Sequence, residues 1–445
     1  MKKVLVVGAG RSAISLISYL INKSEDQNWK ITVADQSIQT ANEKTNGHPN
    51  TKAIELNVND SVHVTREIAK ADIVVSLVPP ELHIHLVKYC MVNKKHFVTA
   101  SYVSEDMRKV HGEASKSNLI FLNEMGLDPG IDHMDTMRLL SKVKKIGGKP
   151  YSLKSYCGGL ITPESDNNPW GYKITWNPMS VLKAGSASAK YLENGRLKIV
   201  PYNRIFLDTQ HVDVPGLGKY ESYPNRDSLK YKSKYNLPDI PNIYRGSLRK
   251  IGFCAAWNAL VQIGLTDNSY FVPNSNQLSY REWLSAYLDK TNGVTTKDTL
   301  IKFLGDSADA EILDKLEWLG ILSDKKINVK NATPADILFD LITRKWDFKK
   351  TDRDMIVLQT EVEYELKNNK EKLTSSLIVR GDDYHRTAMA KTVGMPLGIG
   401  VNLILNNKIK ERGVMIPTFK DIYMPALKEL SELGIEFKEQ TIEVI

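Results

Sequence analysis

The stretch Lys3-Val4-Leu5-Val6-Val7-Gly8-Ala9-Gly10-Arg11-Ser12-Ala13 decides the fold of the first part of this 445-residue chain. It opens with a short, largely β-branched apolar run, which is typical of a parallel strand buried on both faces. The pattern Gly-x-Gly-x-x-Ala follows at once, and residues 14–20 carry apolar side chains at helical spacing. Gly8 permits a tight turn, Gly10 leaves room for a pyrophosphate over the helix N-terminus, and Ala13 lets helix and strand pack closely. This context predicts a dinucleotide-binding Rossmann unit.

A second predicted strand, residues 30–34, ends at Asp35. An acid at this place in a Rossmann domain binds the ribose 2′-hydroxyl of the dinucleotide. Gln36 and Ser37 follow without an arginine to receive a 2′-phosphate, which a carboxylate should repel. The sequence therefore predicts NAD in preference to NADP, with NADP as the second cofactor to test. The alternative is an ordinary solvated aspartate at a strand end.

Four more apolar runs extend the pattern, at residues 53–58, 72–78, 96–100 and 119–122. Six strands separated by helical stretches predict an α/β fold with a doubly wound parallel sheet, which binds ligands at the carboxyl ends of its strands. The residues expected at the cofactor are Gly8, Gly10, Arg11, Ser12, Ala13, Asp35, Gln36, Asn57, Val58, Val78, Thr99 and Ala100. His83 and His85 lie two apart on a predicted helix and do not share a face, so no metal pair is expected and both are predicted to be partly exposed.

The stretch Asn123-Glu124-Met125-Gly126-Leu127-Asp128-Pro129-Gly130-Ile131-Asp132-His133 follows the sixth predicted strand. Asp128-Pro129-Gly130 is typical of a turn, and Asp132 is expected to cap the helix that begins there. Its place after a strand puts the stretch at the ligand end of the sheet. The stretch is then expected to point into the nucleotide crevice, with Leu127 and Pro129 at the cofactor. The alternative is a well-capped loop with a structural role alone.

Composition is that of a soluble globular protein of two or three domains, with 42% hydrophobic and 25% charged residues. The net charge of +8 is spread along the chain, so neither nucleic acid nor a membrane is expected as a partner. Three distant cysteines without a CxxC pattern indicate a reducing compartment and no zinc framework. The N-terminal apolar run is too short for a signal peptide, and no apolar stretch approaches bilayer length. A cytoplasmic protein is expected.

Several longer motifs resemble those of the saccharopine dehydrogenase, L-glutamate-forming (saccharopine reductase), family. They are Thr99-Ala100-Ser101-Tyr102-Val103-Ser104, the stretch 124–133, Ser155-Tyr156-Cys157-Gly158-Gly159-Leu160, residues 168–177, Tyr223-Pro224-Asn225-Arg226-Asp227-Ser228 and Tyr244-Arg245-Gly246-Ser247-Leu248-Arg249. The resemblance runs from Gly8 to residues 390–394, which is nearly the whole chain.

The resemblance implies three domains and a homodimer. A Rossmann domain would cover residues 1–127, with the segment 391–445 returning to it. A second α/β domain with a mixed sheet would take residues 128–264 and 350–390 and contribute to dimerisation. A small all-α domain would be inserted over residues 265–349. Helical spacing at residues 280–288, 296–304, 308–319 and 334–342, and strand-like runs at 355–360 and 375–380, are compatible with this arrangement.

The implied reaction is oxidation of the secondary amine of saccharopine by a nicotinamide cofactor, giving glutamate and 2-aminoadipate 6-semialdehyde in lysine metabolism, or the reverse imine reduction. Carboxylates favour bidentate arginines, and the imine steps need groups that move protons. The implied substrate contacts are Ser101, Tyr102, Asp128, Arg226, Arg245, Gly246 and Ser247. Tyr102, Asp128 and Cys157 are the expected proton-transfer residues. Trp176 and Asn177 are expected to line the binding site of the nicotinamide ring.

Several of these residues could instead have a purely structural role. Arg226 and Arg245 could form ordinary ion pairs, Cys157 could be a buried small residue, and Trp176 a core tryptophan. For the whole protein, one competing hypothesis is a carboxynorspermidine- or homospermidine-type dehydrogenase on the same fold. Arginines in two separate motifs favour a substrate with several carboxylates instead. The other hypothesis is a non-catalytic nucleotide-binding regulator, which the combined glycine turn, Asp128 and Arg226 argue against.

Overall fold

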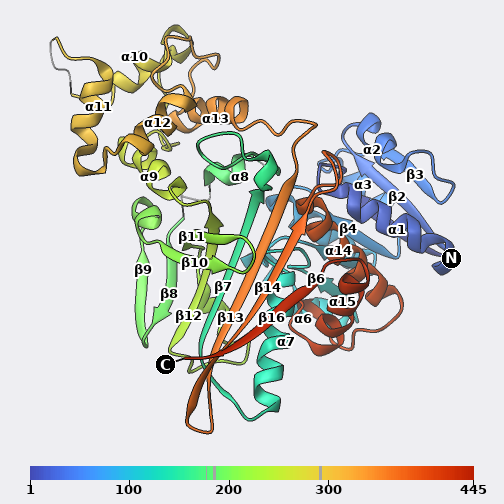
Figure 1. The fold of residues 1–445 in the computed structure, drawn as a ribbon. Coiled ribbons are helices and arrows are strands. Elements are labelled where there is room, and N and C mark those ends of the chain that lie inside the picture. Colours follow the sequence, from blue (N-terminus) through green and yellow to red (C-terminus); the bar gives the residue numbers. More distant parts are fainter. Residues whose placement is uncertain (177, 184–186, 290–292, 445) are drawn as a thin grey trace. The chain divides into compact units, whose positions relative to one another are not determined.

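The computed structural model describes residues 1–176, 178–183, 187–289 and 293–444 (Figure 1). The chain forms two compact units. Unit 1 consists of Met1–Pro150 and Thr360–Ile445, and unit 2 consists of Tyr151–Gln359. The three-domain borders inferred from the resemblance stay a prediction.

Within the described residues, unit 1 contains a seven-stranded sheet in the order β15-β6-β5-β4-β1-β2-β3, and every pair of neighbouring strands in it is parallel. The strands are β1 (Lys2–Val7), β2 (Trp29–Asp35), β3 (Thr51–Glu55), β4 (Ile73–Ser76), β5 (His96–Thr99), β6 (Ile120–Leu122) and β15 (Gly413–Met415). The predicted Rossmann sheet is confirmed. The third strand is shifted, because it begins at Thr51 and leaves Asn57 and Val58 in the following loop. The seventh strand, β15, was not predicted.

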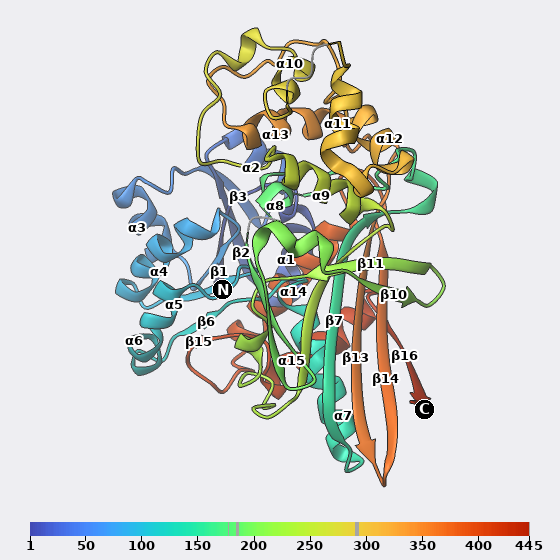
Figure 2. The ribbon, with the colours of Figure 1, turned by 90° about the vertical axis from the view of Figure 1, so that its left-hand side faces the viewer.

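Helices cover both faces of this sheet, as a doubly wound fold requires. On one face, α3 and α4 pack on β1 and β4 through a buried cluster that includes Leu5, Val64, Ile68 and Leu86; Figure 2 shows both helices on the same side of the strands. On the other face, α14 packs along α1 and contacts β4 and β5. The helices of unit 1 are α1 (Ala13–Gln27), α2 (Ile38–Thr45), α3 (Ser61–Lys70), α4 (His83–Val92), α5 (Glu105–Lys109), α6 (His111–Lys116), α7 (Ile131–Lys145), α14 (Ala388–Leu405) and α15 (Lys420–Glu432).

Helix α14 differs from the expectation in two respects. Glycines at positions 394, 398 and 400 favour breaks between short helical pieces, but the helix is continuous through Pro396. Among the described residues it is also the one helix long and apolar enough to cross a membrane, with a mean hydropathy of 1.4, so the prediction that no apolar stretch reaches this length is wrong. However, 78% of it is buried within the protein, as in the core helix of a globular domain.

Unit 2 is built on a mixed sheet, as predicted. Its strands follow the order β10-β11-β12-β7-β13, with β12 and β7 parallel and β11 antiparallel to β12. The strands are β7 (Lys149–Ile161), β8 (Ala189–Glu193), β9 (Arg196–Val200), β10 (Gln210–Val214), β11 (Gly218–Pro224), β12 (Asn242–Arg249) and β13 (Asp354–Leu366). The first two residues of β7 and the part of β13 from Thr360 onward belong to unit 1. Within unit 1, β14 (Asn369–Arg380) pairs with β16 (Phe437–Glu443) in antiparallel fashion.

The helical periodicity predicted for the later part of unit 2 is confirmed. The predicted helices correspond to α10 (Tyr280–Ser285), α11 (Thr296–Leu304), α12 (Ala310–Leu319) and α13 (Pro334–Lys345). Two further helices of unit 2, α8 (Pro178–Lys183) and α9 (Phe253–Ile263), come earlier in the chain. Capping boxes at Ser279 and Thr333 fix where α10 and α13 begin. These helices belong to the same compact unit as the mixed sheet, so a separate inserted all-α domain is not confirmed. Short 3₁₀ turns lie at Pro80–Leu82, Pro163–Ser165, Tyr202–Leu207, Ser228–Tyr231, Ser275–Gln277 and Gly305–Ser307.

Candidate active site

The glycine turn between β1 and α1 is shaped to receive an anion. Gly8 has φ +102°, and an added Cβ would lie 3.0 Å from the carbonyl carbon of Leu77, so this position requires glycine. At Gly10 an added Cβ would meet nothing within 4 Å, which leaves the space over the turn open. In the part of the chain that the structure describes, the amides of Gly10, Arg11 and Ser12 donate to no protein acceptor. Three free N–H groups at a helix N-terminus fit the pyrophosphate of a dinucleotide.

Asp35 stands at the end of β2, as predicted. Its Oδ2 accepts the Ala9 N–H at 2.7 Å, and its Oδ1 accepts the Ser37 N–H at 3.0 Å. The carboxylate therefore ties the glycine turn to the neighbouring strand end, while the residue remains half-exposed. From Gln36 to Glu43 the sequence contains neither arginine nor lysine. The end of β2, where the ribose of a dinucleotide is expected to bind, is therefore lined by a carboxylate and neutral polar groups.

A network of hydroxyls around one imidazole lies at the carboxyl ends of β4 and β5. His83 Nδ1 is 2.8 Å from Ser76 Oγ, and His83 Nε2 is 2.8 Å from Ser101 Oγ and 3.2 Å from Thr99 Oγ1. Burial lowers the pKa of His83 to about 4, so the ring is neutral at physiological pH. The prediction that His83 is partly exposed is wrong, because α4 begins at this residue with 3% of it exposed, whereas His85 is exposed.

Tyr102 and Asp128 are brought together, although 26 residues separate them. The Tyr102 hydroxyl donates to Asp128 Oδ1 at 2.9 Å. The stretch 123–133 is attached to the end of β5 by two backbone bonds, from the Glu124 N–H to Ser101 O and from the Met125 N–H to Thr99 O, each 3.1 Å long. The sequence-based expectation that this stretch lies at the ligand end of the sheet is therefore met.

Buried charges fix the shape of the same stretch. Glu124 Oε1 accepts the Val103 N–H at 3.0 Å, and Glu124 Oε2 lies 2.9 Å from His133 Nε2. His133 Nδ1 is 3.3 Å from Asp132 Oδ2. Asp132 does not cap α7 in the predicted way: its Oδ1 accepts the N–H of Gly130, the N-cap residue itself, at 2.6 Å. The aspartate therefore closes the turn that carries Asp128.

Strand order explains why the remaining predicted cofactor residues gather at one edge. The strands β5, β4, β1, β2 and β3 are consecutive neighbours in a parallel sheet, so the residues that follow them share its carboxyl edge. Val78 follows β4, Thr99 ends β5, and Ala100 comes next. Asn57 and Val58 occupy the loop after β3, and Leu127 and Pro129 belong to the stretch beside β5.

Unit 2 presents a cationic face on β12. Arg245, Ser247 and Arg249 alternate along this strand and therefore project to one side of the sheet. Arg245 is buried with its guanidinium 4.5 Å from the centre of the Tyr231 ring. The Asn225 N–H donates to Arg245 O at 2.8 Å, which places Arg226, an exposed residue with φ +56°, immediately after the strand beside it. Of the two arginines expected to contact substrate carboxylates, Arg245 thus lies on β12 and Arg226 lies just after its neighbour β11.

Cys157 and Ser247 are opposite one another on the parallel strands β7 and β12, and Tyr223 faces Ser247 from β11. Cys157 is buried, in keeping with either of its two interpretations. A Cβ added at Gly246 would overlap Ser222 Oγ, so a larger residue there would collide with that hydroxyl. Trp176 is half-buried, and Asn177 lies outside the described residues. In the described ranges, no cluster of three His, Cys, Asp or Glu side chains could hold a metal ion.

Arg249 is a residue that the sequence analysis did not single out. Its guanidinium is buried among the rings of Tyr172, Tyr223 and Phe253, at 5.0–5.4 Å from their centres. It donates to Tyr223 Oη at 3.2 Å and to Leu248 O at 2.7 Å. Its Nε has no hydrogen-bond partner among the residues that the structure describes. Arg249 lies four residues after Arg245, and on a strand this even spacing places both arginines on the same face. That spacing could have identified Arg249 from the sequence.

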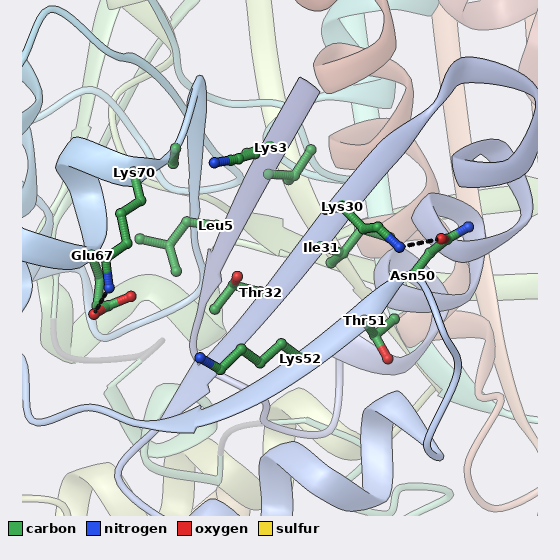
Figure 3. A pocket seen from close by; sticks show the side chains of 12 residues that line it. Lys3, Leu5, Lys30, Ile31, Thr32, Asn50, Thr51, Lys52, Glu67 and Lys70 are labelled. Atoms are coloured by element: carbon green, nitrogen blue, oxygen red, sulfur yellow. Dashed lines mark hydrogen bonds and ion pairs between the residues drawn. The ribbon is translucent and has the colours of Figure 1, made fainter. Parts of the chain in front are cut away.

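A cavity of about 280 Å³ lies elsewhere on unit 1, at the amino ends of β1, β2 and β3 (Figure 3). Four lysines line it, but two are already paired: Lys30 Nζ donates to Asn50 Oδ1 at 2.8 Å and Lys70 Nζ to Glu67 Oε1 at 2.7 Å. Because parallel sheets bind ligands at the opposite, carboxyl edge, this cavity is not the candidate site.

Comparison with known proteins identifies the family. A model of the saccharopine dehydrogenase NADP binding domain matches residues 4–122, and one of the saccharopine dehydrogenase C-terminal domain matches residues 126–435. The chain belongs to the saccharopine dehydrogenase family. A saccharopine dehydrogenase (NADP(+), L-glutamate-forming) of Schizosaccharomyces pombe is 34% identical over 454 residues, covering 100% of both chains. The protein of the same name from Saccharomyces cerevisiae is 34% identical and covers 99% of both.

Solved structures agree with this family assignment. The apo saccharopine dehydrogenase (L-Glu forming) from Saccharomyces cerevisiae superposes with a TM-score of 0.88 at 33% identity, covering 99% of this chain and 100% of that one. The homospermidine synthase from Legionella pneumophila in complex with NAD reaches a TM-score of 0.59 at 9% identity over 100% of this chain and 91% of that one. That second likeness shows a shared fold alone, so the polyamine-type hypothesis gains no support beyond the fold.

Proposed function

We propose that the protein is a nicotinamide-dependent saccharopine dehydrogenase that forms L-glutamate and 2-aminoadipate 6-semialdehyde, or catalyses the reverse reduction. The observation that carries the proposal is the Tyr102–Asp128 hydrogen bond of 2.9 Å, at the same sheet edge as the phosphate cradle of Gly10, Arg11 and Ser12. A proton-handling pair beside a dinucleotide site suits the oxidation of a secondary amine. The proteins named for this activity match the chain over its full length.

The residues of this chain have distinct roles in the proposal. The free amides of the glycine turn bind the pyrophosphate, and Asp35 accepts hydroxyl protons of the ribose. When bound, the nicotinamide supplies the hydride acceptor. Tyr102 and Asp128 hold and move the proton of the substrate amine, with Cys157 as a further candidate. Arg226, Arg245 and Arg249 bind carboxylates, because a planar guanidinium pairs with a carboxylate through two parallel bonds.

For the cofactor, we propose that this chain prefers NAD, although the relatives carry NADP(+) in their names. Support comes from Asp35, whose carboxylate occupies the end of β2, and from the lack of a basic residue between Gln36 and Glu43. A 2′-phosphate placed beside that carboxylate would be repelled and would find no cationic partner on the turn. The family assignment itself does not depend on this preference.

A direct assay tests both parts of the proposal. The purified protein is given saccharopine with NAD or with NADP, and the appearance of reduced nicotinamide and of glutamate is followed. Reduction with saccharopine, and a higher kcat/KM with NAD, are expected. No reduction with either nucleotide would contradict the function, and a higher kcat/KM with NADP would contradict the role given to Asp35. Turnover of a carboxylated polyamine in place of saccharopine would favour the competing enzyme class.

We further propose that the protein is a homodimer in a reducing, cytoplasmic environment. Cys90 and Cys254 are free thiols, and all three cysteines, Cys157 included, are buried, which suits such a compartment. Light scattering after size-exclusion chromatography is expected to give about twice the 50.2 kDa of one chain. A mass equal to that of one chain at micromolar concentration would contradict the dimer.

A further inference from the structure

Thr99 determines where the protons lie in the network around His83. A threonine hydroxyl has one hydrogen to donate and two lone pairs to accept with. Thr99 Oγ1 lies 3.0 Å from Ser76 O, 3.3 Å from the Ser101 N–H and 3.2 Å from His83 Nε2. A carbonyl can only accept, so it takes the single hydrogen of Thr99. The threonine must then accept from both nitrogens, and Nε2 of His83 carries a hydrogen.

The tautomer of His83 fixes the neighbouring hydroxyls in turn. With the hydrogen on Nε2, the bare Nδ1 accepts from Ser76 Oγ at 2.8 Å. Nε2–H is shared between Thr99 Oγ1 and Ser101 Oγ, which accepts it at 2.8 Å. Ser101 therefore keeps its own hydroxyl hydrogen. Ser76, His83 and Thr99 are buried, whereas Ser101 is half-exposed, so this hydrogen lies at the outer end of the network.

We propose that His83 is a positioning residue that holds Ser101 as a hydrogen-bond donor to a carboxylate of the substrate. Accepting from Nε2–H orients the Ser101 oxygen and leaves its hydrogen for an acceptor outside the protein. A carboxylate is such an acceptor, and saccharopine carries several. The neutral ring suits the task, because His83 keeps one donor and one acceptor nitrogen while burial disfavours its protonation. This inference rests on the proposed function for the identity of the ligand.

A double-mutant cycle separates positioning from a merely structural role. His83→Phe keeps a ring beside Phe97 but removes both nitrogens. We expect it to raise KM for saccharopine about 10-fold with kcat within about 3-fold, since the lost bond involves substrate binding. In the Ser101→Ala background the same substitution should change KM less than about 2-fold. An equal loss in both backgrounds would overturn the proposal.

Two further variants complete the kinetic test. His83→Gln retains a donor of similar reach and should recover part of the KM loss, and it replaces His83→Phe in the cycle if the latter fails to fold. His85→Gln, on the same helix but exposed, is the matched control and should leave KM unchanged. No recovery by glutamine relative to phenylalanine would count against the hydrogen-bonding role.

The tautomer can be measured without any substrate. In protein with ¹⁵N-labelled histidine, the signal that disappears in His83→Gln belongs to His83, and it should show a neutral ring protonated at Nε2. A ring protonated at Nδ1 would overturn the inference. If Nε2 carries the hydrogen but saccharopine is not turned over, the proposed function fails while the assigned hydrogen-bond network stands. The two failures are therefore distinguishable.

Discussion

The hydroxyl of Tyr102 donates to Oδ1 of Asp128 at 2.9 Å, and this bond joins the segment after β5 to the turn before α7. In the proposed function the pair shares a proton with the substrate amine. Tyr102→Phe removes the hydroxyl while preserving the ring. We expect kcat/KM for saccharopine to fall about 10-fold, the cost of losing one hydrogen bond to a charged group.

Steady-state kinetics with saturating cofactor measures this effect. Tyr202→Phe, at an exposed tyrosine of unit 2, serves as the control and should behave like the wild type. An unchanged kcat/KM in Tyr102→Phe would show that the tyrosine hydroxyl takes no part in proton transfer or substrate binding.

Asp35→Ala should weaken the discrimination between the two nicotinamide cofactors. The substitution removes the carboxylate that repels a 2′-phosphate, and it also frees the Ala9 N–H, now held at 2.7 Å. We expect kcat/KM with NAD to fall about 10-fold and the NAD-to-NADP ratio to move toward one. Asp26→Ala, at an exposed position on α1, is the matched control. A ratio unaffected by Asp35→Ala would remove the basis of the proposed NAD preference.

Arg249 offers a test in which stability and activity should diverge. No carboxylate lies within 4.0 Å of its guanidinium among the described residues, and its cross-strand neighbour Glu221 accepts the Cys254 N–H at 2.6 Å instead. A buried cation without an ion pair costs stability. We therefore expect Arg249→Met to leave Tm unchanged or raise it, while kcat/KM for saccharopine falls about 100-fold.

Differential scanning fluorimetry and kinetics on the same preparation give both values. Arg196→Met, at an exposed position on β9, controls for the loss of one positive charge and should change neither. If Arg249→Met lowers Tm strongly and leaves the kinetic parameters of the remaining folded protein intact, the arginine has a structural role.

Local signals account for what could be predicted of the fold. Short apolar runs bounded by turns gave the six consecutive strands of unit 1, and the glycine turn gave the position of the cofactor edge. Strand β15 was not predicted because it has only three residues and pairs with β6, which lies almost 300 residues earlier in the chain. No local pattern encodes such a pairing. The glycines of α14 resembled breaks because sequence spacing does not show which helix packs against them.

Site residues could be predicted where they belong to a sequence motif. They were harder to predict where their hydrogen-bond partners come from several different strands. Tyr102, Asp128, Arg226 and Arg245 were chosen from motifs. His83 was misjudged because helical periodicity gives the face of a side chain but not the hydroxyls of Ser76, Thr99 and Ser101 that surround it. Buried imidazoles depend on such long-range partners. Arg249 could be identified only after residues 242–249 were recognised as a strand, because only then does its spacing from Arg245 place both side chains on one face.

Lowering the pH should destabilise the protein through His83. Burial lowers its pKa from 6.5 to about 4, so between these values the unfolded chain binds a proton that the folded protein does not. Stability falls as the pH falls through this window, by about 3 kcal/mol in total. The hydrogen-bonding partners of the ring are uncharged hydroxyls, and Glu81 on the preceding turn acts against the shift, which burial dominates.

The difference in Tm between about pH 7.5 and about pH 5 measures this contribution. His83→Gln cannot titrate, so its Tm should fall less than that of the wild type over this interval. His211→Gln, at an exposed position, should follow the wild type. Parallel curves for His83→Gln and the wild type would show that the folded protein protonates this ring as readily as the unfolded chain does.

Gly398 lets α14 lie directly against α1, and replacing it should destabilise unit 1. A Cβ at this position would overlap the ring of Tyr19, which is itself buried and donates to Glu429 Oε1 at 2.7 Å. The ring cannot move without breaking that bond, so we expect Gly398→Ala to cost about 2 kcal/mol despite the better helix propensity of alanine. Thermal unfolding should show a Tm several degrees lower. Gly112→Ala provides the contrast, because Gly112 is an exposed residue of α6 with nothing within 4 Å of an added Cβ, and there alanine should be neutral or stabilising. If both variants raise Tm alike, the two helices do not need the glycine for their close packing.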